Sequence, residues 1–201
     1  MEIYFVRHGQ TDGNVAHRHQ HEDSEINELG RVQAKEVAKK IADLEPTHIV
    51  SSTNFRAIET TKIIITECNL DLIPETNPAF EEFHRPSWLT GNRFLSYLSI
   101  KYVLGWFYSS SNGEGETYDD FLKRILEARA YLEALPEDSK VVVVTHSVFI
   151  NIFLEHICRD KRINLWRAIV RFWHVFTISN GSITHLRYAK KDKQCSWEVV
   201  G

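Results

Sequence analysis

Three short apolar runs separated by segments of helical periodicity constrain the fold of this chain more than any other feature. The runs cover Ile3–Val6, His48–Ser51 and Val141–Thr145, and the stretch KVVVVTH around the third is the clearest. A strand that is apolar on both faces belongs in the interior of a sheet covered by helices. The alternation therefore predicts an α/β fold with a mainly parallel central sheet and helices on both faces.

The segments between the runs are predicted to be helices. Residues 27–44 place an apolar stripe on one side and Asn27 at the N-cap; the stripe consists of Leu29, Val32, Val37, Ile41 and Leu44. Further helices are predicted over Phe55–Cys68, Glu116–Leu135 and Ser147–Cys158. Near the end of the chain, an Asn-Gly pair between two alternating runs predicts a hairpin over residues 174–188. With no repeat or linker, we expect one domain over residues 1–201.

Composition narrows the set of partners. The 24 basic and 27 acidic residues give a net charge of −3, so no global field attracts nucleic acid or an acidic membrane surface. No leader segment and no apolar stretch long enough for a membrane span is evident. Cys68, Cys158 and Cys195 are widely spaced and lack a CxxC pattern, which favours reduced thiols in a cytoplasmic protein.

Polar side chains follow each buried run at the point where the strand should end. They are Arg7 and His8 after the first run, Ser52 and Arg56 after the second, and His146 after the third. The carboxyl ends of parallel strands share one edge of a sheet, where α/β folds bind ligands. Cations gathered there repel one another unless an anion joins them, and guanidinium groups match phosphate oxygens. Each residue alone is more often structural or solvated, but their recurrence at three strand ends favours a phosphate site.

Five motifs in this order resemble those of the histidine phosphatase superfamily, the phosphoglycerate-mutase-like proteins. RHGQT followed by Asn14 is similar to the family pattern RHGxTxxN, and DSEINELGRVQA to DxPLTxxGxxQA, with Glu25 in place of proline. SSTNFRAIET is similar to SSPLxRAxET, GETYDDFLKR to GESxxxxxxR, and VTHS to VTHG. The resemblance runs along nearly the whole chain and implies a phosphoglycerate-mutase-like fold.

The resemblance also implies a mechanism and a role for each matching residue. His8 would attack phosphorus to give a phosphohistidine, which water then hydrolyses. Arg7, Arg56 and a protonated His146 would hold the phosphoryl oxygens, and Asn14 would add a neutral donor. We expect neither a metal nor another cofactor, because these side chains supply the positive charge.

The general acid is expected in the stretch AFEEFHRPSWLTG, which offers Glu81 and Glu82. Matching Phe80 to the leucine of the family pattern puts Glu82 in the acid position. Neighbouring residues of an extended segment point to opposite faces, so only one of the two glutamates should reach the substrate. Beyond the acid, HRPSWLTG replaces the usual glycine and WEG of the family.

Two further segments leave alternatives open. His17, His19 and His21 alternate in a loop that could bind a metal ion, although the favoured alternative is a solvated or substrate-contacting loop. Residues 94–108 are aromatic and helix-like, and core packing is favoured over a lid that contacts an apolar part of the substrate. The proposed core stripe consists of Phe94, Leu98, Tyr102 and Trp106.

We therefore expect a phosphomonoesterase that acts on a small phosphorylated metabolite. The alternatives are a phosphoglycerate-type mutase and a catalytically silent phosphate-binding module. Mutases of the family usually carry a longer insertion between the acid and the GES-like motif, whereas Glu82 and Glu116 are only 34 positions apart here. This spacing favours hydrolysis, and the presence of His8 with its expected partners argues against a silent module.

Overall fold

A mixed β-sheet forms the centre of the protein in the computed structural model, which describes residues 1–108, 114–164, 166–168, 170, 178–191 and 195–201. The strands are β1 (Glu2–Arg7), β2 (His48–Ser51), β3 (Glu75–Thr76), β4 (Lys140–Thr145), β5 (Ile183–Tyr188) and β6 (Trp197–Val199). Their order across the sheet is β3-β2-β4-β1-β5-β6. β1 to β4 are parallel, whereas β5 runs antiparallel to β1, and β6 to β5. The predicted, mainly parallel α/β fold is confirmed.

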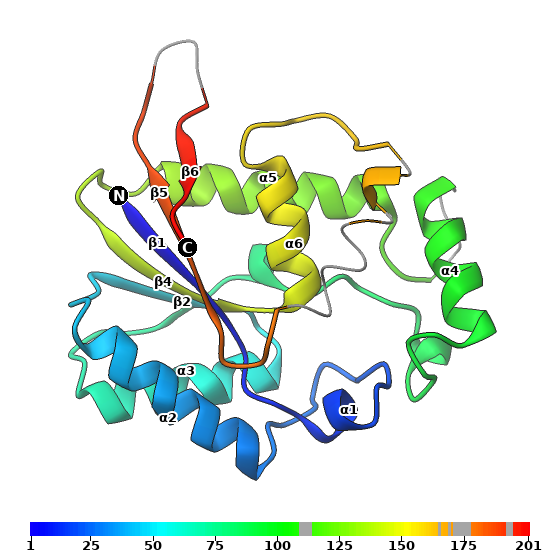
Figure 1. The fold of residues 1–201 in the computed structure, drawn as a ribbon, viewed down its shortest axis with the longest axis horizontal. Helices are drawn as coiled ribbons and strands as arrows, with labels where there is room; N and C mark the ends of the chain where they lie inside the picture. The colour runs from blue at the N-terminus through cyan, green and yellow to red at the C-terminus, as the bar shows by residue number, and fades with distance from the viewer. Residues whose placement is uncertain (109–113, 165, 169, 171–177, 192–194) are drawn as a thin grey trace.

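Helices cover both faces of this sheet (Figure 1). α2 (Glu28–Ala42) and α3 (Phe55–Cys68) pack together on one face, and α5 (Tyr118–Glu133) and α6 (Ser147–His156) lie on the other. The short α1 (Asp12–Val15) follows β1, and α4 (Tyr97–Tyr108) lies toward one end of the molecule. Single 3₁₀ turns occur at Pro78–Phe80 and Ser87–Leu89.

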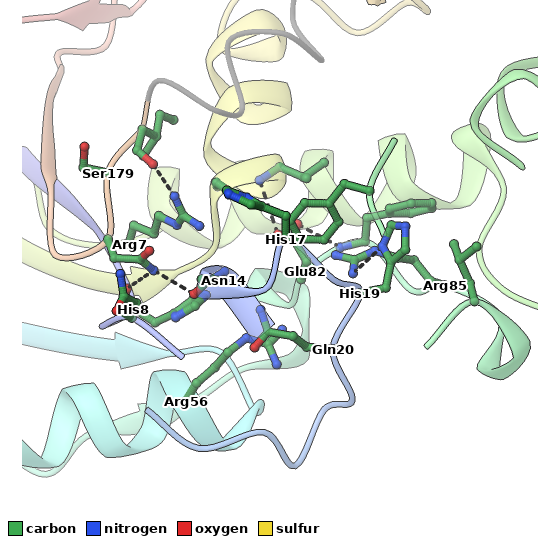
Figure 2. Close-up of a pocket in the computed structure, with 18 of the residues that line it drawn as sticks. Arg7, His8, Asn14, His17, His19, Gln20, Arg56, Glu82, Arg85 and Ser179 are labelled. Atoms are coloured by element: carbon green, nitrogen blue, oxygen red, sulfur yellow. Dashed lines mark hydrogen bonds between the residues drawn. The ribbon is translucent and has the colours of Figure 1, made fainter. Parts of the chain in front are cut away.

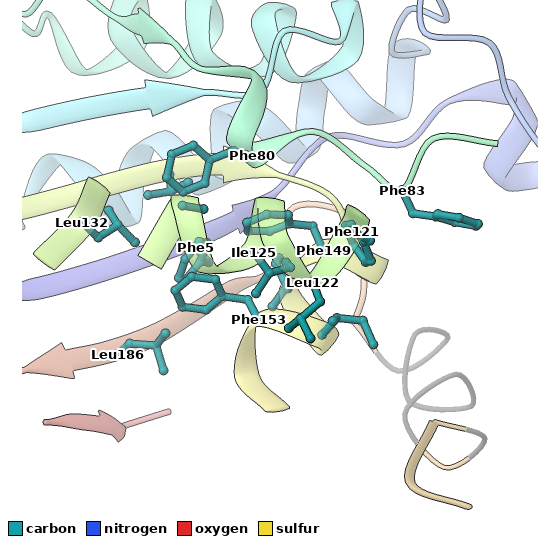
Figure 3. Packing of buried hydrophobic residues seen from close by; sticks show 14 of the residues in the cluster. Phe5, Phe80, Phe83, Phe121, Leu122, Ile125, Leu132, Phe149, Phe153 and Leu186 are labelled. Carbon is teal, nitrogen blue, oxygen red and sulfur yellow. The ribbon is translucent and has the colours of Figure 1, made fainter. Parts of the chain in front are cut away.

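The two faces of the sheet have different cores. On the α5 and α6 side the core is rich in aromatic side chains that are fully buried, as Figure 3 shows for Phe5, Phe80, Phe121, Phe149 and Phe153. On the α2 and α3 side it is mostly aliphatic and includes Val6, Ile41, Ile49, Ile64 and Val144. Alternate residues of β4 point to opposite cores, which explains why all four valines of that strand are buried.

Helix α2 begins as predicted but buries a different face. The Oδ1 atom of Asn27 accepts a hydrogen bond from the backbone N–H of Gly30 at 2.9 Å, which confirms the N-cap. Leu29 and Val32 are 50% and 48% exposed, however, so the first half of the predicted stripe is wrong. The helix instead approaches the loop after β1 through small residues: a Cβ at Gly30 would lie 2.2 Å from the carbonyl oxygen of Gln10.

The C-terminal part of the chain departs from the predicted hairpin. Asn180 and Gly181 form the predicted turn, with Gly181 at a φ of +68° that suits glycine. The run before this turn falls largely on residues 171–177, which lie outside the described ranges. The strand after it, β5, pairs with β1 and with β6, so the hairpin seen in the structure is β5–β6.

The expectation of reduced cysteines is wrong for one pair. Cys158 and Cys195 form a disulfide, with their Cα atoms 5.3 Å apart. The two cysteines are 37 positions apart in the sequence, and they come close because Cys195 lies just before β6. Their spacing in the sequence does not indicate this contact. Cys68 is free, and its thiol donates to the carbonyl oxygen of Ala38 at 3.0 Å. In the described ranges, no helix has the length and apolar character needed to cross a membrane.

Candidate active site

A cavity of about 440 Å³ opens at the carboxyl ends of β1, β2 and β4, which are neighbours in the sheet. Its lining includes five of the six predicted site residues, namely Arg7, His8, Asn14, Arg56 and Glu82 (Figure 2). The sixth, His146, lies directly beside them, because its ring centroid is 5.0 Å from that of His8. The structure thus brings together residues that are up to 139 positions apart in the chain.

The imidazole of His8 is held as a neutral ring with one defined free nitrogen. Its Nδ1 atom lies 2.7 Å from the carbonyl oxygen of Gly9, which can only accept, so Nδ1 carries the proton and Nε2 the lone pair. Burial lowers the pKa of His8 well below its ordinary value, and the charges of Arg56 and Arg7 act in the same direction. His8 is therefore unprotonated at neutral pH and suited to nucleophilic attack.

Close packing explains why glycine follows this histidine. A Cβ at Gly9 would lie 2.4 Å from the carbonyl oxygen of Gly30 in α2. The backbone N–H of Gly9 also donates to the hydroxyl of Thr60 in α3 at 3.0 Å. The two helices beneath the sheet therefore fix the backbone carbonyl that orients His8.

His146 is fully buried at the N-cap of α6, and its ring, like that of His8, is neutral. Its Nε2 atom lies 2.8 Å from the hydroxyl of Ser52, whereas its Nδ1 atom has no partner among the described residues. Burial lowers the pKa of His146 well below its ordinary value, with further contributions from Arg56, His8, Arg85 and Arg7. An anion bound among these groups would reverse the electrostatic part of this shift and favour the imidazolium.

Arg7 and Arg56 bring positive charge to the cavity without a carboxylate bound to either. Arg7 donates to the carbonyl of Ile178, and Arg56 donates to the carbonyl of His21 at 3.0 Å. Neither forms an ion pair with a described residue. Burial lowers the pKa of Arg56 to about 10, which leaves it charged at neutral pH. Two desolvated guanidinium groups of this kind are complementary to a phosphoryl dianion.

Asn14 is oriented by its neighbours so that its amide can donate. Its Oδ1 atom accepts from the backbone N–H of Thr11 at 3.2 Å and from the side chain of Asn180 at 3.1 Å, which leaves Nδ2 for a ligand. Asn180 also donates to the carbonyl oxygen of His8 at 3.0 Å and lines the cavity. Sequence reasoning treated Asn180 only as a turn residue and missed this role, because nothing local links it to His8.

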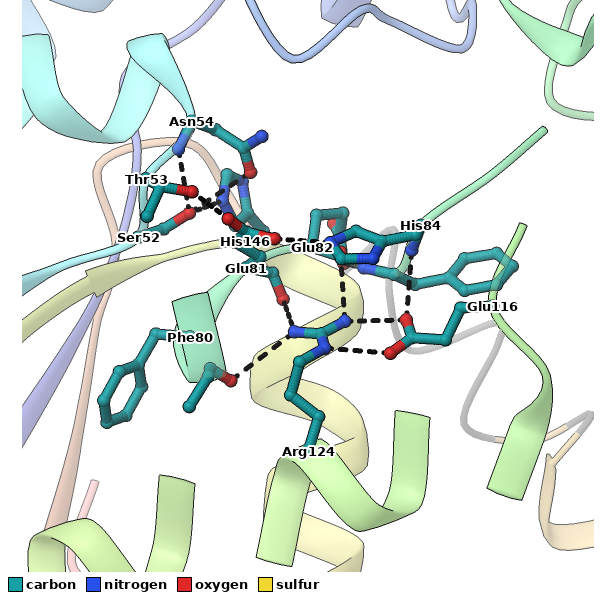
Figure 4. Close-up of polar contacts among 12 residues, drawn as sticks. Ser52, Thr53, Asn54, Phe80, Glu81, Glu82, His84, Glu116, Arg124 and His146 are labelled. Atoms are coloured by element: carbon teal, nitrogen blue, oxygen red, sulfur yellow. Dashed lines mark hydrogen bonds and ion pairs between the residues drawn. The ribbon is translucent and has the colours of Figure 1, made fainter. Parts of the chain in front are cut away.

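Glu82 and Glu81 have clearly different surroundings (Figure 4). The carboxylate of Glu82 lines the cavity and accepts backbone N–H bonds from Phe83, Val148 and Phe149 at 3.1, 3.3 and 3.1 Å. The last two donors belong to the first turn of α6. The carboxylate of Glu81 instead binds the hydroxyl of Thr53 and the ring of His84, and it is not among the residues that line the cavity.

A buried ion pair fixes the segment that carries these glutamates. Arg124 of α5 binds Glu116 through two bonds of 2.8 and 2.7 Å, and the two side chains are only 11% and 7% exposed. The same guanidinium donates to the carbonyls of Glu81 at 2.6 Å and Glu82 at 3.2 Å (Figure 4). Glu116 accepts from the backbone N–H of His84 at 3.1 Å. The sequence placed both residues at the ends of the GETYDDFLKR motif but gave no indication of this function.

The three alternating histidines take separate positions. His17 and His19 line the cavity, whereas His21 is exposed and lies 3.2 Å from Asp23. Burial and the charge of Arg85 lower the pKa of His19 to about 3, so this ring is neutral. In the parts of the chain that the structure describes, no group of three His, Cys, Asp or Glu side chains is arranged to hold a metal ion.

The aromatic segment around α4 serves as core and as cavity wall. Tyr102 and Trp106 are buried against Phe83, and both line the cavity together with Phe94. Leu98 is 45% exposed, so its predicted place in the core stripe is wrong. It lies in the first turn of α4, which begins at Tyr97, whereas Tyr102 and Trp106 follow about one and two turns later and pack on Phe83.

Comparisons with known proteins identify the family and the fold. Residues 3–199 match the family model of the histidine phosphatase superfamily, branch 1. A probable phosphoglycerate mutase GpmB of Proteus mirabilis is 31% identical over 162 residues, which cover 77% of this chain and 73% of the relative. The structure of a mycobacterial glucosyl-3-phosphoglycerate phosphatase in complex with VO3 is 25% identical, with a TM-score of 0.74, and the match covers 98% of this chain and 96% of that one. An Escherichia coli structure described as a putative α-ribazole-5′-P phosphatase, 15% identical, has the same fold, with a TM-score of 0.77 and coverage of 100% and 95%.

Proposed function

This chain belongs to branch 1 of the histidine phosphatase superfamily, and we propose that it is a metal-independent phosphomonoesterase that acts through a phosphohistidine. The observation that carries the proposal is the neutral His8 ring, whose Nε2 lone pair is free beside two guanidinium groups that have no carboxylate partner among the described residues. This combination suits attack on a bound phosphoryl group. The mycobacterial structure named as a glucosyl-3-phosphoglycerate phosphatase also supports a hydrolase.

In the first step, Nε2 of His8 attacks phosphorus in line with the leaving oxygen. The N–P bond forms as the P–O bond breaks, and the protonated carboxyl of Glu82 delivers its proton to the leaving alkoxide. The ring then carries a positive charge, which the hydrogen bond from Nδ1 to the carbonyl of Gly9 stabilises. The product is a phosphohistidine, with the carboxylate of Glu82 beside it.

In the second step, water attacks the phosphohistidine. The Glu82 carboxylate takes a proton from this water as the new P–O bond forms and the N–P bond breaks. Phosphate leaves, and His8 returns to its neutral form. Through both steps Arg7, Arg56 and the imidazolium of His146 stabilise the charge on the transferring oxygens, as divalent cations do in many other phosphoryl-transfer enzymes.

A mutase is the second candidate, and the relative named as a probable phosphoglycerate mutase favours it. The two reactions share the first step and differ in what accepts the phosphoryl group. Release of inorganic phosphate from 2- or 3-phosphoglycerate indicates hydrolysis, whereas interconversion of the two isomers without phosphate release indicates a mutase. The interval between Glu82 and Glu116 supports hydrolysis, because family mutases usually carry a longer insertion there.

The proposed partner is a small phosphorylated substrate, and neither nucleic acid nor a membrane is part of the proposal. A panel of phosphorylated metabolites, together with para-nitrophenyl phosphate, tests the function with wild-type protein and His8→Ala. Hydrolysis that requires His8 supports a phosphomonoesterase. A protein that binds phosphate but turns over no member of the panel would instead be a silent phosphate-binding module.

A further inference from the structure

We propose, on the premise of the phosphatase function above, that Arg85 and the aromatic wall around α4 form a second subsite in the cavity. This subsite would bind the leaving group and would select phosphomonoesters of aromatic alcohols that carry an additional anionic group. Neither the match to the family nor the phosphate-binding residues assign a function to Arg85, which lies in the stretch where HRPSWLTG departs from the family pattern.

The cavity is larger than a phosphoryl group requires. Its volume of about 440 Å³ lies within the range of pockets that enclose whole small molecules. Beyond the phosphate-binding residues, one part of the lining is apolar and consists of Phe83, Leu89, Phe94, Tyr102, Val103 and Trp106. The ring of Phe83 stacks with that of Tyr102, with their centroids 5.8 Å apart, and its centroid lies 4.8 Å from that of the Trp106 ring. Rigid aromatic surfaces of this kind bind flat rings well.

Arg85 places in this wall a positive charge that has no ion-pair partner among the described residues. Its guanidinium lines the cavity, and its one hydrogen bond to a described residue is to Nδ1 of His19 at 3.3 Å. Because His19 is neutral, it does not balance the charge of Arg85, and Arg85 forms no ion pair with any described carboxylate. Burial lowers the pKa of Arg85, and the negative charge of Glu82 offsets only part of this effect. An anionic group on a ligand would compensate it.

The direction of the reaction places Arg85 on the leaving-group side. In-line attack by His8 puts the leaving oxygen on the far side of phosphorus, where Glu82 protonates it. The chain continues from Glu82 through Phe83 to Arg85, whose guanidinium lies 5.8 Å from the centre of the Phe83 ring. In the proposed mechanism Arg7, Arg56, Asn14 and His146 supply the donors to the phosphoryl group. The charge of Arg85 also acts on Arg56 and His146, so Arg85 adjoins the phosphate-binding residues and is placed to meet a group attached to the leaving oxygen.

The orientation of His19 supports a preformed subsite. Because Nδ1 accepts from Arg85, Nε2 donates to the hydroxyl of Ser99 at 2.9 Å, and this hydroxyl donates to the carbonyl of Arg93 at 2.8 Å. The chain of hydrogen bonds ties Arg85 to the start of α4, and thus to the helix that carries Tyr102 and Trp106. These bonds fix the position of the Arg85 guanidinium relative to the aromatic side chains of the subsite before a ligand binds.

The substrates of the test are phenyl phosphate, the phosphate esters of 3- and 4-hydroxybenzoate, and the corresponding carboxamides. The carboxamides preserve the ring and the size of the substituent but lack its charge. For the wild-type protein we expect KM to be roughly tenfold lower for at least one carboxylate than for its carboxamide, the effect of one charge-assisted contact. Equal KM values within each pair would overturn the proposal without any need for a variant.

Variants identify the residue responsible. Arg85→Gln should make the KM values of each carboxylate and its carboxamide equal, whatever its effect on turnover of phenyl phosphate, and Arg85→Lys should retain part of the preference. Arg93→Gln is the matched control, because Arg93 is exposed and does not line the cavity. A preference that survives in Arg85→Gln would assign the selectivity elsewhere and overturn the role of Arg85.

The two proposals fail in different ways. If no ester is hydrolysed, or if hydrolysis persists in His8→Ala, the phosphatase function itself is wrong. If hydrolysis depends on His8 but KM is no lower for the carboxylate esters than for their carboxamides, only the subsite proposal is wrong.

Discussion

The Nδ1 atom of His8 donates to the carbonyl oxygen of Gly9 across 2.7 Å, and this single bond determines which ring nitrogen is available for chemistry. The Gly9 backbone is itself held by Thr60 and by its contact with Gly30, so the tautomer does not depend on a mobile group. Nε2 is therefore the nitrogen that should carry phosphate during turnover.

We predict that phosphate becomes covalently attached to His8. A phosphoramidate is labile in acid and survives base, so a rapid quench in alkali should preserve the label and an acid quench should lose it. Mass spectrometry of the N-terminal peptide then locates the phosphate. His8→Ala should lower kcat/KM by a factor on the order of 10³ or more, since it removes the nucleophile. Phosphate on any other residue contradicts the mechanism.

Glu82→Gln should slow hydrolysis of alkyl phosphates far more than that of para-nitrophenyl phosphate. The nitrophenolate needs little protonation to depart, whereas an alkoxide depends on the acid, whose contribution is about 10²–10⁴-fold. Glu81→Gln is the matched control and should have little effect on either substrate, because Glu81 does not line the cavity. If Glu81→Gln instead loses activity toward alkyl phosphates only, the general acid is Glu81 and the assignment to Glu82 is wrong.

Binding of an anion should be accompanied by proton uptake. Burial and nearby positive charges lower the pKa values of His8 and His146, and a bound anion should favour the charged form of His146. Sulfate does not titrate between pH 6 and 8, so calorimetry in buffers of different ionisation enthalpy isolates the proton taken up by the protein. The affinity for sulfate should rise as the pH falls. The uptake should vanish in His146→Asn and persist in His48→Asn, since His48 starts β2 at the edge away from the site.

The same shifts give the sign of the pH dependence of stability. Because both folded-state pKa values are depressed, the unfolded chain binds more protons as the pH falls below about 6.5, the ordinary value for histidine. The stabilisation from these neutral rings is present above that pH and is lost below it. Thermal unfolding of the ligand-free protein should therefore shift to lower temperature between pH 7 and pH 5, and His146→Asn should reduce the shift. An unchanged shift in this variant contradicts the assignment.

Arg124→Met should cost about 3 kcal/mol of stability, because it leaves the buried Glu116 carboxylate without its partner. It should also impair alkyl phosphates more than aryl phosphates, since Arg124 positions the segment that carries Glu82. Arg124→Lys should recover part of both effects. The neighbouring Lys123→Met, with an exposed side chain, should change neither. A loss of stability with no selectivity between leaving groups would show that Arg124 is purely structural.

Chelation should leave the activity intact. The cationic side chains around His8 supply the charge that a divalent ion would otherwise bring, so turnover of para-nitrophenyl phosphate in EDTA should equal that without it. Loss of activity in EDTA and its return with added Mg²⁺ would show that the side chains are insufficient.

Local signals in the sequence were enough to predict β1, β2 and β4 and the convergence of their ends. His48–Ser51 and Phe55–Cys68 have the predicted bounds because strong periodicity and clear flanking residues define them. The exposure of Leu29 and Leu98 could not be predicted, because it depends on which side of each helix the rest of the chain covers. The contacts of Asn180, Arg85 and Arg124, and the Cys158–Cys195 disulfide, join segments far apart in the sequence, and no local pattern encodes such pairs.

The position of Arg85 and α4 beyond Glu82 has a consequence for how such a protein can change over time. The residues proposed to bind and attack the phosphoryl group follow the carboxyl ends of three neighbouring strands, whose positions the sheet fixes. The residues proposed to bind the leaving group belong instead to residues 83–106 and to the loop at His19. Substitutions in this wall can alter the choice of alcohol while the nucleophile and its cations keep their places. Related proteins can therefore keep the same phosphoryl-transfer reaction and come to act on different metabolites through substitutions in the leaving-group subsite alone.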